Sequence, residues 1–448
     1  MKNLRAESHK PDENRRTFLT AMAAGILGGV RVGRGTSEVA AWTGLDTNSV
    51  LNQARPLDST AGLKIAKVEP LILRLKNPGG DPLSRNPSAE WNRHFMLCRV
   101  ETEEGLVGWG EGTDFPKVAS VATEIDLLKS SVIGQSAWNI ELIWNRLYRA
   151  RNSQWGSTVQ SAIACIDIAL WDIVAQRLGV PLYRLLGGKI HDKLAIYTSY
   201  RWGNIPKTAD AYARRTRELV GEGAKAGKWD PFFDPIDFNR QATLKTLHEV
   251  REMTRGIREG GPEFEICVEA HAKFNTASAV RIAKELEPFN PMFFEEPVAP
   301  ENADAMAEVQ RATSIPIAAG ERIKSRLGLR EYLEKQAFRL FQPDAAHVGG
   351  ITEYRKMAAM AETYFIPVAP HNPNGPVCFA AQLHLSAATP NFVIFEEGRT
   401  DPLVCKEWFG EWEESRAYFK VPESPGLGIK ISEAAIRAQA VDIAKAER

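Results

Sequence analysis

Short apolar runs that end in an acidic residue or a histidine recur at nearly constant spacing in the C-terminal half of the chain. One of them is Ile266-Cys267-Val268, which directly precedes Glu269. Successive end residues lie 26, 26, 23, 27 and 25 positions apart. A step of this length accommodates one strand, one helix and two loops, so the pattern predicts alternating β/α units. The six end residues are Glu269, Glu295, Glu321, Asp344, His371 and Glu396.

Two earlier apolar runs extend this series, one ending near Tyr197-Thr198 and the other at Lys228-Trp229-Asp230. They bring the number of predicted strands to about eight, with helices between them such as 276–286 and 352–363. The spacing therefore predicts an α/β fold, a parallel barrel over residues 191–400. In such barrels the C-terminal strand ends converge on one mouth, which is where the chemistry sits.

The region before the barrel has a different pattern of apolar and polar residues. Apolar and polar residues alternate in 65–75, 95–100 and 106–111, which predicts a three-stranded meander. Residues 118–186 carry apolar residues at steps of three and four, which is typical of helices. We expect an α+β domain at 61–190. Its segment 79–91 is rich in Gly, Pro, Asn and Ser and is predicted to be a surface loop that closes over a site.

Residues 1–60 differ from both regions. The pair Arg15-Arg16 precedes a short run of small and apolar residues, 20–30, which resembles a twin-arginine export signal. The alternative is a disordered extension. The first interpretation predicts a periplasmic, exported protein and the second is compatible with a cytoplasmic one.

Composition excludes several classes of protein. The chain has 56 basic and 56 acidic residues, so it lacks the surplus of positive charge that a dedicated nucleic-acid binder needs. No run of eighteen or more apolar residues is present, and we expect no membrane partner. The five cysteines are scattered and form no CxxC pair, which predicts buried free thiols.

Three carboxylates on consecutive predicted strands point to a divalent metal. Glu269, Glu295 and Glu321 offer only oxygen ligands, which Mg²⁺ prefers in octahedral geometry with positions left open for substrate. Zinc is disfavoured because no histidine/cysteine quartet accompanies them. We expect one Mg²⁺ per chain at this mouth.

The remaining strand ends suit proton transfer. Asp344 and His371 follow adjacent strands, so the carboxylate is expected to hold the imidazole in one tautomer and raise its basicity. His271 lies two residues after Glu269 and is interpreted either as an acid or as a supporting hydrogen-bond partner. Lys228 suits a base or an electrostatic partner of the carboxylates.

Beyond these single residues, the chain contains a set of longer motifs. They are 101–111 (ETEEGLVGWGE), 166–172 (IDIALWD), 185–188 (LLGG), 294–297 (FEEP), 319–321 (AGE), Pro343-Asp344 with Gly349-Gly350, and 425–428 (PGLG). Together they resemble the mandelate racemase/muconate lactonizing enzyme family of the enolase superfamily, from about Lys64 to the C-terminus. The family includes sugar-acid dehydratases, galactonate dehydratase among them.

The resemblance implies a (β/α)₇β TIM-like barrel with an N-terminal α+β capping domain, and a C-terminal segment, 401–448, that packs back towards the cap. It implies metal ligation by Glu269, Glu295 and Glu321, and a last-strand carboxylate at Glu396. Two positions depart from the family pattern. The first ligand is often Asp, and a second Lys, two residues after Lys228, is replaced by Asp230, which disfavours a two-base racemase.

The resemblance further implies removal of a proton next to a carboxylate. A metal ion offsets the developing charge, protonated Glu396 assists as a hydrogen-bond donor, His371 takes the proton and His271 protonates a leaving hydroxyl. We expect a Mg²⁺-dependent sugar-acid dehydratase that yields a 2-keto-3-deoxy acid and assembles as a homo-oligomer. A racemase or epimerase of a 2-hydroxy acid and a non-catalytic sugar-acid binder are the alternatives.

Overall fold

The computed structural model describes residues 62–77, 91–114, 117–150, 156–199, 202, 205–232, 241–398 and 415–442. All of them belong to one compact unit, Gly62–Arg448. The export signal or extension predicted at 1–60 lies outside the described residues, and so does the predicted closing loop except Trp91, which begins a strand.

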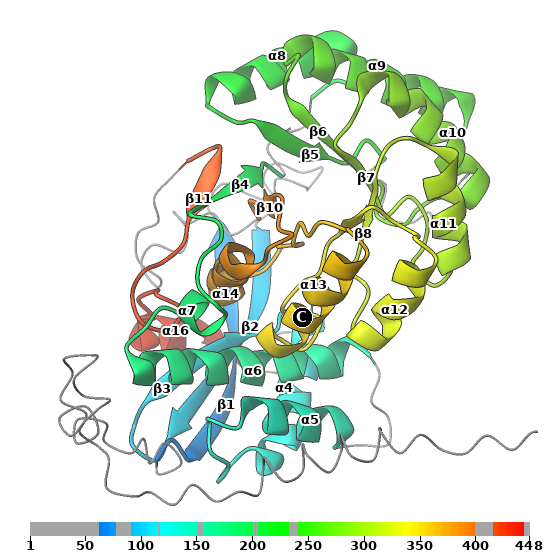
Figure 1. Cartoon of the computed structure of the whole chain (residues 1–448). Helices are drawn as coiled ribbons and strands as arrows, with labels where there is room; N and C mark the ends of the chain where they lie inside the picture. Colours follow the sequence, from blue (N-terminus) through cyan, green and yellow to red (C-terminus); the bar gives the residue numbers. More distant parts are fainter. Residues whose placement is uncertain are drawn as a thin grey trace, which may run out of the picture. The chain divides into compact units, whose positions relative to one another are not determined.

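An antiparallel sheet opens this unit (Figure 1). Three of its strands form the predicted meander, and the turn between the last two places Gly105 at φ +81°. A fourth strand from the end of the described chain pairs with the first, which local alternation did not predict. The strands are β1 (Ile65–Asn77), β2 (Trp91–Thr102), β3 (Val107–Glu111) and β12 (Ala440–Val441).

Helices cover this sheet, and the long helix α6 packs directly on β3. A Cβ added at Gly108, Gly110 or Gly112 would lie about 2 Å from a backbone oxygen of α6, which explains the repeated glycines of this motif. The helices are α4 (Val118–Leu128), η1 (Lys129–Ser131), α5 (Ile140–Arg149), α6 (Ser157–Leu178) and α7 (Leu182–Leu185).

Among the described residues, one helix, α6, has the length and apolar composition of a membrane span. Most of the window that meets this test is buried inside the protein. Several polar side chains on it, including Asp167 and Asp172, are also buried and hydrogen-bonded to other parts of the chain. These contacts are those of a core helix.

Replacing Gly110 with alanine is expected to lower the melting temperature strongly. The new Cβ would lie 1.7 Å from the carbonyl oxygen of Cys165, and helix and strand must separate to admit it. Overpacking of this kind costs about 1–3 kcal/mol, and more where backbone is the obstacle. Gly221→Ala is the matched control, since among the described residues no atom outside its own helix backbone and chain neighbours lies within 4 Å of the new methyl group. Equal melting temperatures for the two variants would contradict the packing argument.

Eight parallel strand positions follow and confirm the barrel. Five of them form one sheet, β5-β6-β7-β8-β9. Thr198 bridges β4 to Gly227 of β5, Val368 bridges both Phe341 and Phe392, and Phe395 pairs with Ile196, so the ring closes. The positions are β4 (Lys193–Tyr197), β5 (Ala226–Trp229), β6 (Glu265–Glu269), β7 (Phe293–Glu295), β8 (Ile317–Ala319), β9 (Leu340–Phe341), the bridge at Val368, and β10 (Phe395–Glu396).

In the part of the barrel that the structure describes, seven α-helices connect these positions, and they surround the strands (Figure 1). One buried residue from each strand position fills the inside of the barrel: Tyr197, Ala226, Cys267, Phe293, Ala318, Leu340, Ala369 and Ile394. The chain therefore has the predicted (β/α)₇β architecture. The helices are α8 (Ala209–Gly221), α9 (Leu244–Gly260), α10 (Thr276–Leu286), α11 (Ala303–Ala312), α12 (Arg326–Glu334), α13 (Ile351–Thr363) and α14 (Pro376–Ala388), and η2 (Glu287–Phe289) follows α10.

Motif residues join the sheet region to the barrel. The carboxylate of Glu111, at the end of β3, accepts hydrogen bonds from the backbone N–H of Gly375 (2.5 Å) and Cys378 (3.0 Å). It thus caps the N-terminus of α14, where a negative charge is favourable.

The C-terminal part of the chain forms β11 (Tyr418–Lys420), which pairs with β4, and the helix α16 (Glu433–Gln439). Cys98, Cys165, Cys267 and Cys378 are buried free thiols, and Cys405 lies outside the described residues.

Asp167 gives stability a specific pH dependence. Its carboxyl is buried on α6 and accepts hydrogen bonds from the backbone N–H (3.0 Å) and hydroxyl (2.5 Å) of Thr352, but burial dominates and raises its pKa from 3.8 to about 7. The folded state therefore binds more protons than the unfolded state between these values. This group makes the free energy of unfolding fall as pH rises from about 4 to about 7.

In Asp167→Asn that contribution is expected to disappear, because an amide can serve the same two Thr352 groups without titrating. Melting temperatures across pH 4–7 should thus show a smaller loss of stability with rising pH in the variant than in the wild type. Parallel pH profiles would contradict the assignment.

Candidate active site

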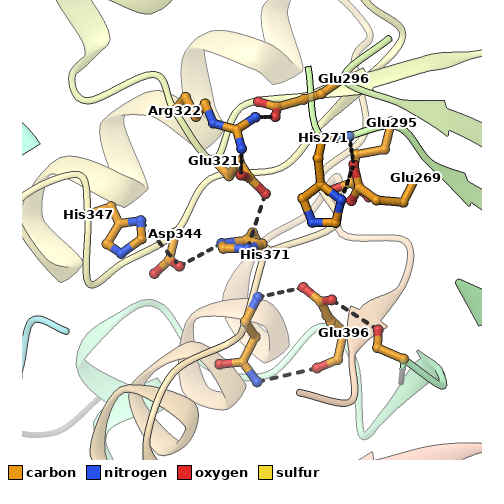
Figure 2. A network of polar contacts seen from close by, with 12 residues as sticks. Glu269, His271, Glu295, Glu296, Glu321, Arg322, Asp344, His347, His371 and Glu396 are labelled. Atoms are coloured by element: carbon orange, nitrogen blue, oxygen red, sulfur yellow. Dashed lines mark hydrogen bonds and ion pairs between the residues drawn. The ribbon is translucent and has the colours of Figure 1, made fainter. Parts of the chain in front are cut away.

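The barrel mouth gathers the side chains that end its strands. Lys228, Glu269 and Glu295 come from β5, β6 and β7, and Glu396 comes from β10. Glu321, Asp344 and His371 follow β8, β9 and the Val368 bridge. Figure 2 shows most of this group as one network of polar contacts.

Lys228 lies among three carboxylates. Its Nζ is 3.2 Å from Oε2 of Glu269, 2.9 Å from Oε2 of Glu295 and 3.1 Å from Oε1 of Glu396. Burial opposes its charge, but the charges of Glu295 and Glu396 outweigh burial and raise the pKa of Lys228 well above its usual value. These contacts favour the electrostatic interpretation of Lys228 over that of a base.

The carboxylates crowd one another. Burial and the neighbouring charge of Glu269 raise the pKa of Glu295 well above its usual range. Burial also opposes ionisation of Glu269, but the charges of His271 and Lys228 outweigh it and lower the pKa of Glu269. Glu321 points towards His371 (Figure 2), and its Oε2 is 3.1 Å from Nε2 of that histidine. All three glutamates offer oxygen ligands, which suit a hard divalent cation, but in this structure Glu269 and Glu295 share the Lys228 ammonium and Glu321 contacts His371.

His371 and Asp344 form a close pair. Nδ1 of His371 is 2.8 Å from Oδ2 of Asp344, whose Oδ1 accepts from the side-chain amide of Asn374 at 2.8 Å. Burial opposes protonation of His371, but the charge of Glu321 and the hydrogen bond to Asp344 raise its pKa. With Nδ1–H donated to Asp344, Nε2 is the nitrogen that faces the rest of the site.

A second histidine is held by a carboxylate on another strand end. Nδ1 of His271 is 2.7 Å from Oδ2 of Asp230, and its backbone N–H donates to Oε1 of Glu269 at 2.6 Å. Burial lowers its pKa, yet the charge of Glu269 and the hydrogen bond to Asp230 prevail and raise it. The structure therefore provides two carboxylate-held imidazoles.

The prediction of a protonated Glu396 is not supported. Its Oε1 accepts from the hydroxyl of Ser199 at 3.0 Å and its Oε2 from the backbone N–H of Asn372 at 2.8 Å. Burial opposes ionisation, but Lys228 and His371 outweigh it and lower the pKa of Glu396. With cationic and donor groups around it, Glu396 acts as a hydrogen-bond acceptor.

Three residues near the dyads have no role predicted from the sequence. Nε2 of His347 contacts the backbone oxygen of Thr113 at 2.9 Å, and its Nδ1 is 3.7 Å from Asp344. Arg322 bridges Glu296 and Glu321. The sequence marks Asp230 only as the replacement of a family lysine. Neither His347 nor Arg322 is the residue that directly ends an apolar run, whereas Asp230 closes the run that ends at Lys228-Trp229-Asp230.

Together, the barrel and its mouth have the form of an enzyme site, with carboxylates and histidines gathered at the C-terminal ends of the strands. Comparison with known sequences identifies the class: residues 78–187 match the mandelate racemase/muconate lactonizing enzyme N-terminal domain, and 211–435 match the enolase C-terminal domain-like family. The chain belongs to the mandelate racemase/muconate lactonizing enzyme family of the enolase superfamily, whose members use a divalent metal ion.

Its relatives include dehydratases of sugar acids. It is 36% identical to D-galactonate dehydratase of Pectobacterium atrosepticum over 351 residues, 76% of this chain and 89% of that protein. It is 32% identical to D-gluconate dehydratase of Thermoproteus tenax, over 82% of this chain and 72% of that protein. A crystal structure described as a dehydratase of Zymomonas mobilis ZM4 superposes with a TM-score of 0.77 at 30% identity, covering 84% of this chain and 98% of that chain.

These relationships place the chain among hydro-lyases, as a sugar-acid dehydratase of the enolase superfamily.

Proposed function

We propose that the protein is a Mg²⁺-dependent dehydratase of an aldonic or aldaric acid, forming a 2-keto-3-deoxy acid through an enediolate. His371 is the base, Asp344 orients it, and His271 is the acid. Glu269, Glu295 and Glu321 are the metal ligands, while Lys228 and Glu396 form an ion pair beside them.

The position of the two held imidazoles carries this proposal. His271 follows the third of the eight strand positions and His371 the seventh, so they lie on opposite sides of the same mouth. Each has Nδ1 against a carboxylate, so Nε2 is the nitrogen that each can present to a molecule between them; in this structure Nε2 of His371 contacts Oε2 of Glu321 at 3.1 Å, a contact that a bound substrate would replace. Removing a proton from one carbon and protonating a hydroxyl on the next carbon require such a pair.

The chemistry then follows in balanced steps. Nε2 of His371 takes the proton from C2, and the electrons of that bond enter the carboxylate as an enediolate. These electrons form the C2–C3 double bond as the C3–O bond breaks, and the departing oxygen takes a proton from Nε2 of His271 and leaves as water. The resulting enol gains a proton at C3 and releases the proton of its C2 hydroxyl, which gives the ketone.

Glu269, Glu295 and Glu321 suit Mg²⁺ because they supply hard oxygen ligands. When bound there, the ion offsets the second negative charge of the enediolate. Among the described residues, Asp344, His347 and His371 are the group whose possible ligand atoms all lie within 4.8 Å of one another, whereas the three glutamates must converge further to share an ion. The two imidazoles of the first group suit a softer ion, and two of its three members serve as the proposed proton-transfer dyad, so we assign Mg²⁺ to the carboxylates.

The two alternatives are less well supported. An epimerase needs a second base, and Lys228 is bound by three carboxylates that keep it charged. A non-catalytic binder has no need for two oriented imidazoles, and the sequence relatives named above are enzymes.

Incubation with Mg²⁺ and a panel of aldonic and aldaric acids tests the proposal. We expect one or a few of them to yield a 2-keto acid, detected as its semicarbazone, and EDTA to abolish the reaction. The absence of keto acid from every member, or a rate unchanged by EDTA, would overturn it.

We further propose export through the Arg15-Arg16 signal and a homo-oligomeric state. Fractionation of cells that express the full chain and its Arg15→Lys/Arg16→Lys variant tests the first: only the unaltered chain should reach the periplasm. Light scattering of the purified protein measures the second.

A further inference from the structure

Asp230 is a polar side chain near the mouth that has several contacts and no role in the proposed reaction. It lies two residues after Lys228, so both side chains leave the strand end on the same side. Its Oδ1 accepts the backbone N–H of Phe232 at 2.7 Å. Its Oδ2 contacts Nδ1 of His271 at 2.7 Å and Nζ of Lys273 at 2.9 Å. Both oxygens therefore have defined partners.

Lys273 secures this carboxylate. Its Nζ also donates to the backbone oxygen of Phe232 at 3.1 Å, and the side chains of Lys273 and Asp230 are each only 10% exposed. A buried carboxylate is stable when it is paired and hydrogen-bonded, as here. Lys273 thus allows a charged Asp230 to remain at this depth.

The backbone between these residues is bent to bring the imidazole back to Asp230. His271 and Ala272 both have positive φ, 47° and 59°. Two successive non-glycine residues in this region are uncommon and persist when their surroundings impose them. Here the N–H of His271 is bound by Glu269 and that of Ala272 donates to the oxygen of Glu296 at 2.7 Å.

We propose that Asp230, held by Lys273, is a positioning residue that fixes His271 with Nε2 towards the leaving hydroxyl. The inference rests on the proposed dehydration and separates its two bond-breaking steps. Breaking of the C2–H bond, with the proton passing to His371, does not involve Asp230. Breaking of the C3–O bond, with the proton passing from His271 to the departing oxygen, depends on it.

Asp230→Asn separates the two halves. The amide retains an oxygen for the N–H of Phe232 but turns an NH₂ group towards Nδ1 of His271 and the ammonium of Lys273, where only an acceptor fits. Water elimination should fall by about 10²- to 10⁴-fold, as in His271→Asn. The double variant should be no slower than the single ones, since the two residues act as a unit.

Two measurements distinguish positioning from general damage. In D₂O, the variant should still exchange the C2 proton of the substrate, followed by NMR. It should also release fluoride from the 3-deoxy-3-fluoro analogue within about ten-fold of the wild-type rate, because fluoride leaves without a proton. Its affinity for Mg²⁺, measured by calorimetry, should equal that of the wild type. Asp192→Asn, whose side chain is 90% exposed, is the matched control.

Water elimination at the wild-type rate in Asp230→Asn would overturn the inference, as would parallel loss of C2 exchange, fluoride release and elimination. If the wild-type enzyme forms no keto acid, the proposed function fails and the inference fails with it.

Discussion

His371→Asn should lose both keto-acid formation and deuterium exchange at C2, by about 10²- to 10⁴-fold, because His371 is the proposed base for that proton. Asparagine can still donate to Asp344 but cannot accept a proton at the position of Nε2. The variant is assayed by NMR in D₂O with the preferred sugar acid and Mg²⁺. It should also fail to release fluoride from the 3-fluoro analogue, unlike Asp230→Asn.

His248→Asn is the control for this prediction, since His248 is exposed on α9. It should retain wild-type rates in every assay. Exchange at C2 that persists in His371→Asn would show that another group is the base.

Glu269→Gln is expected to weaken Mg²⁺ binding by more than about 100-fold, since losing even an outer partner of a metal ligand costs about 10- to 100-fold. The amide keeps the size of the side chain but removes its charge, and Lys228 loses one of its three carboxylates. Calorimetric titration with Mg²⁺ measures the effect, and dehydration should fall in parallel.

Two further variants make this prediction specific. Glu265→Gln lies at the exposed start of the same strand, β6, and should bind Mg²⁺ normally. Glu269→Asp retains a carboxylate and should bind far better than Glu269→Gln. Unchanged affinity in Glu269→Gln would remove this residue from the metal site.

The spacing of strand ends predicted the barrel because each β/α unit is a local repeat. Helix α10 spans Thr276–Leu286 as predicted, and α13 begins one residue before the predicted start, at Ile351. Strand pairing between distant segments leaves no comparable repeat in the sequence. The two-residue strand β12 joins β1 from the far end of the described chain, and the seventh strand position is reduced to bridges at Val368.

The candidate site likewise contains residues that local sequence patterns identify and residues that depend on contacts between distant segments. Residues that end apolar runs were identified because strand direction brings those ends together. Asp230 could be singled out from the sequence because it lies two residues after Lys228, which is the side-chain repeat of a strand. Its role depends on the backbone bend at His271, which no sequence pattern indicates. His347 depends on a contact with Thr113, in the loop that follows β3, which only the folded chain defines.

The most direct test of paired proton transfer across this mouth is the NMR spectrum of the wild-type reaction in D₂O with Mg²⁺. We predict a 2-keto acid that carries one deuterium at C3, delivered when the enol becomes the ketone. Accumulation of C2-deuterated substrate or its epimer, with no keto acid, would contradict elimination and identify a different fate for the enediolate.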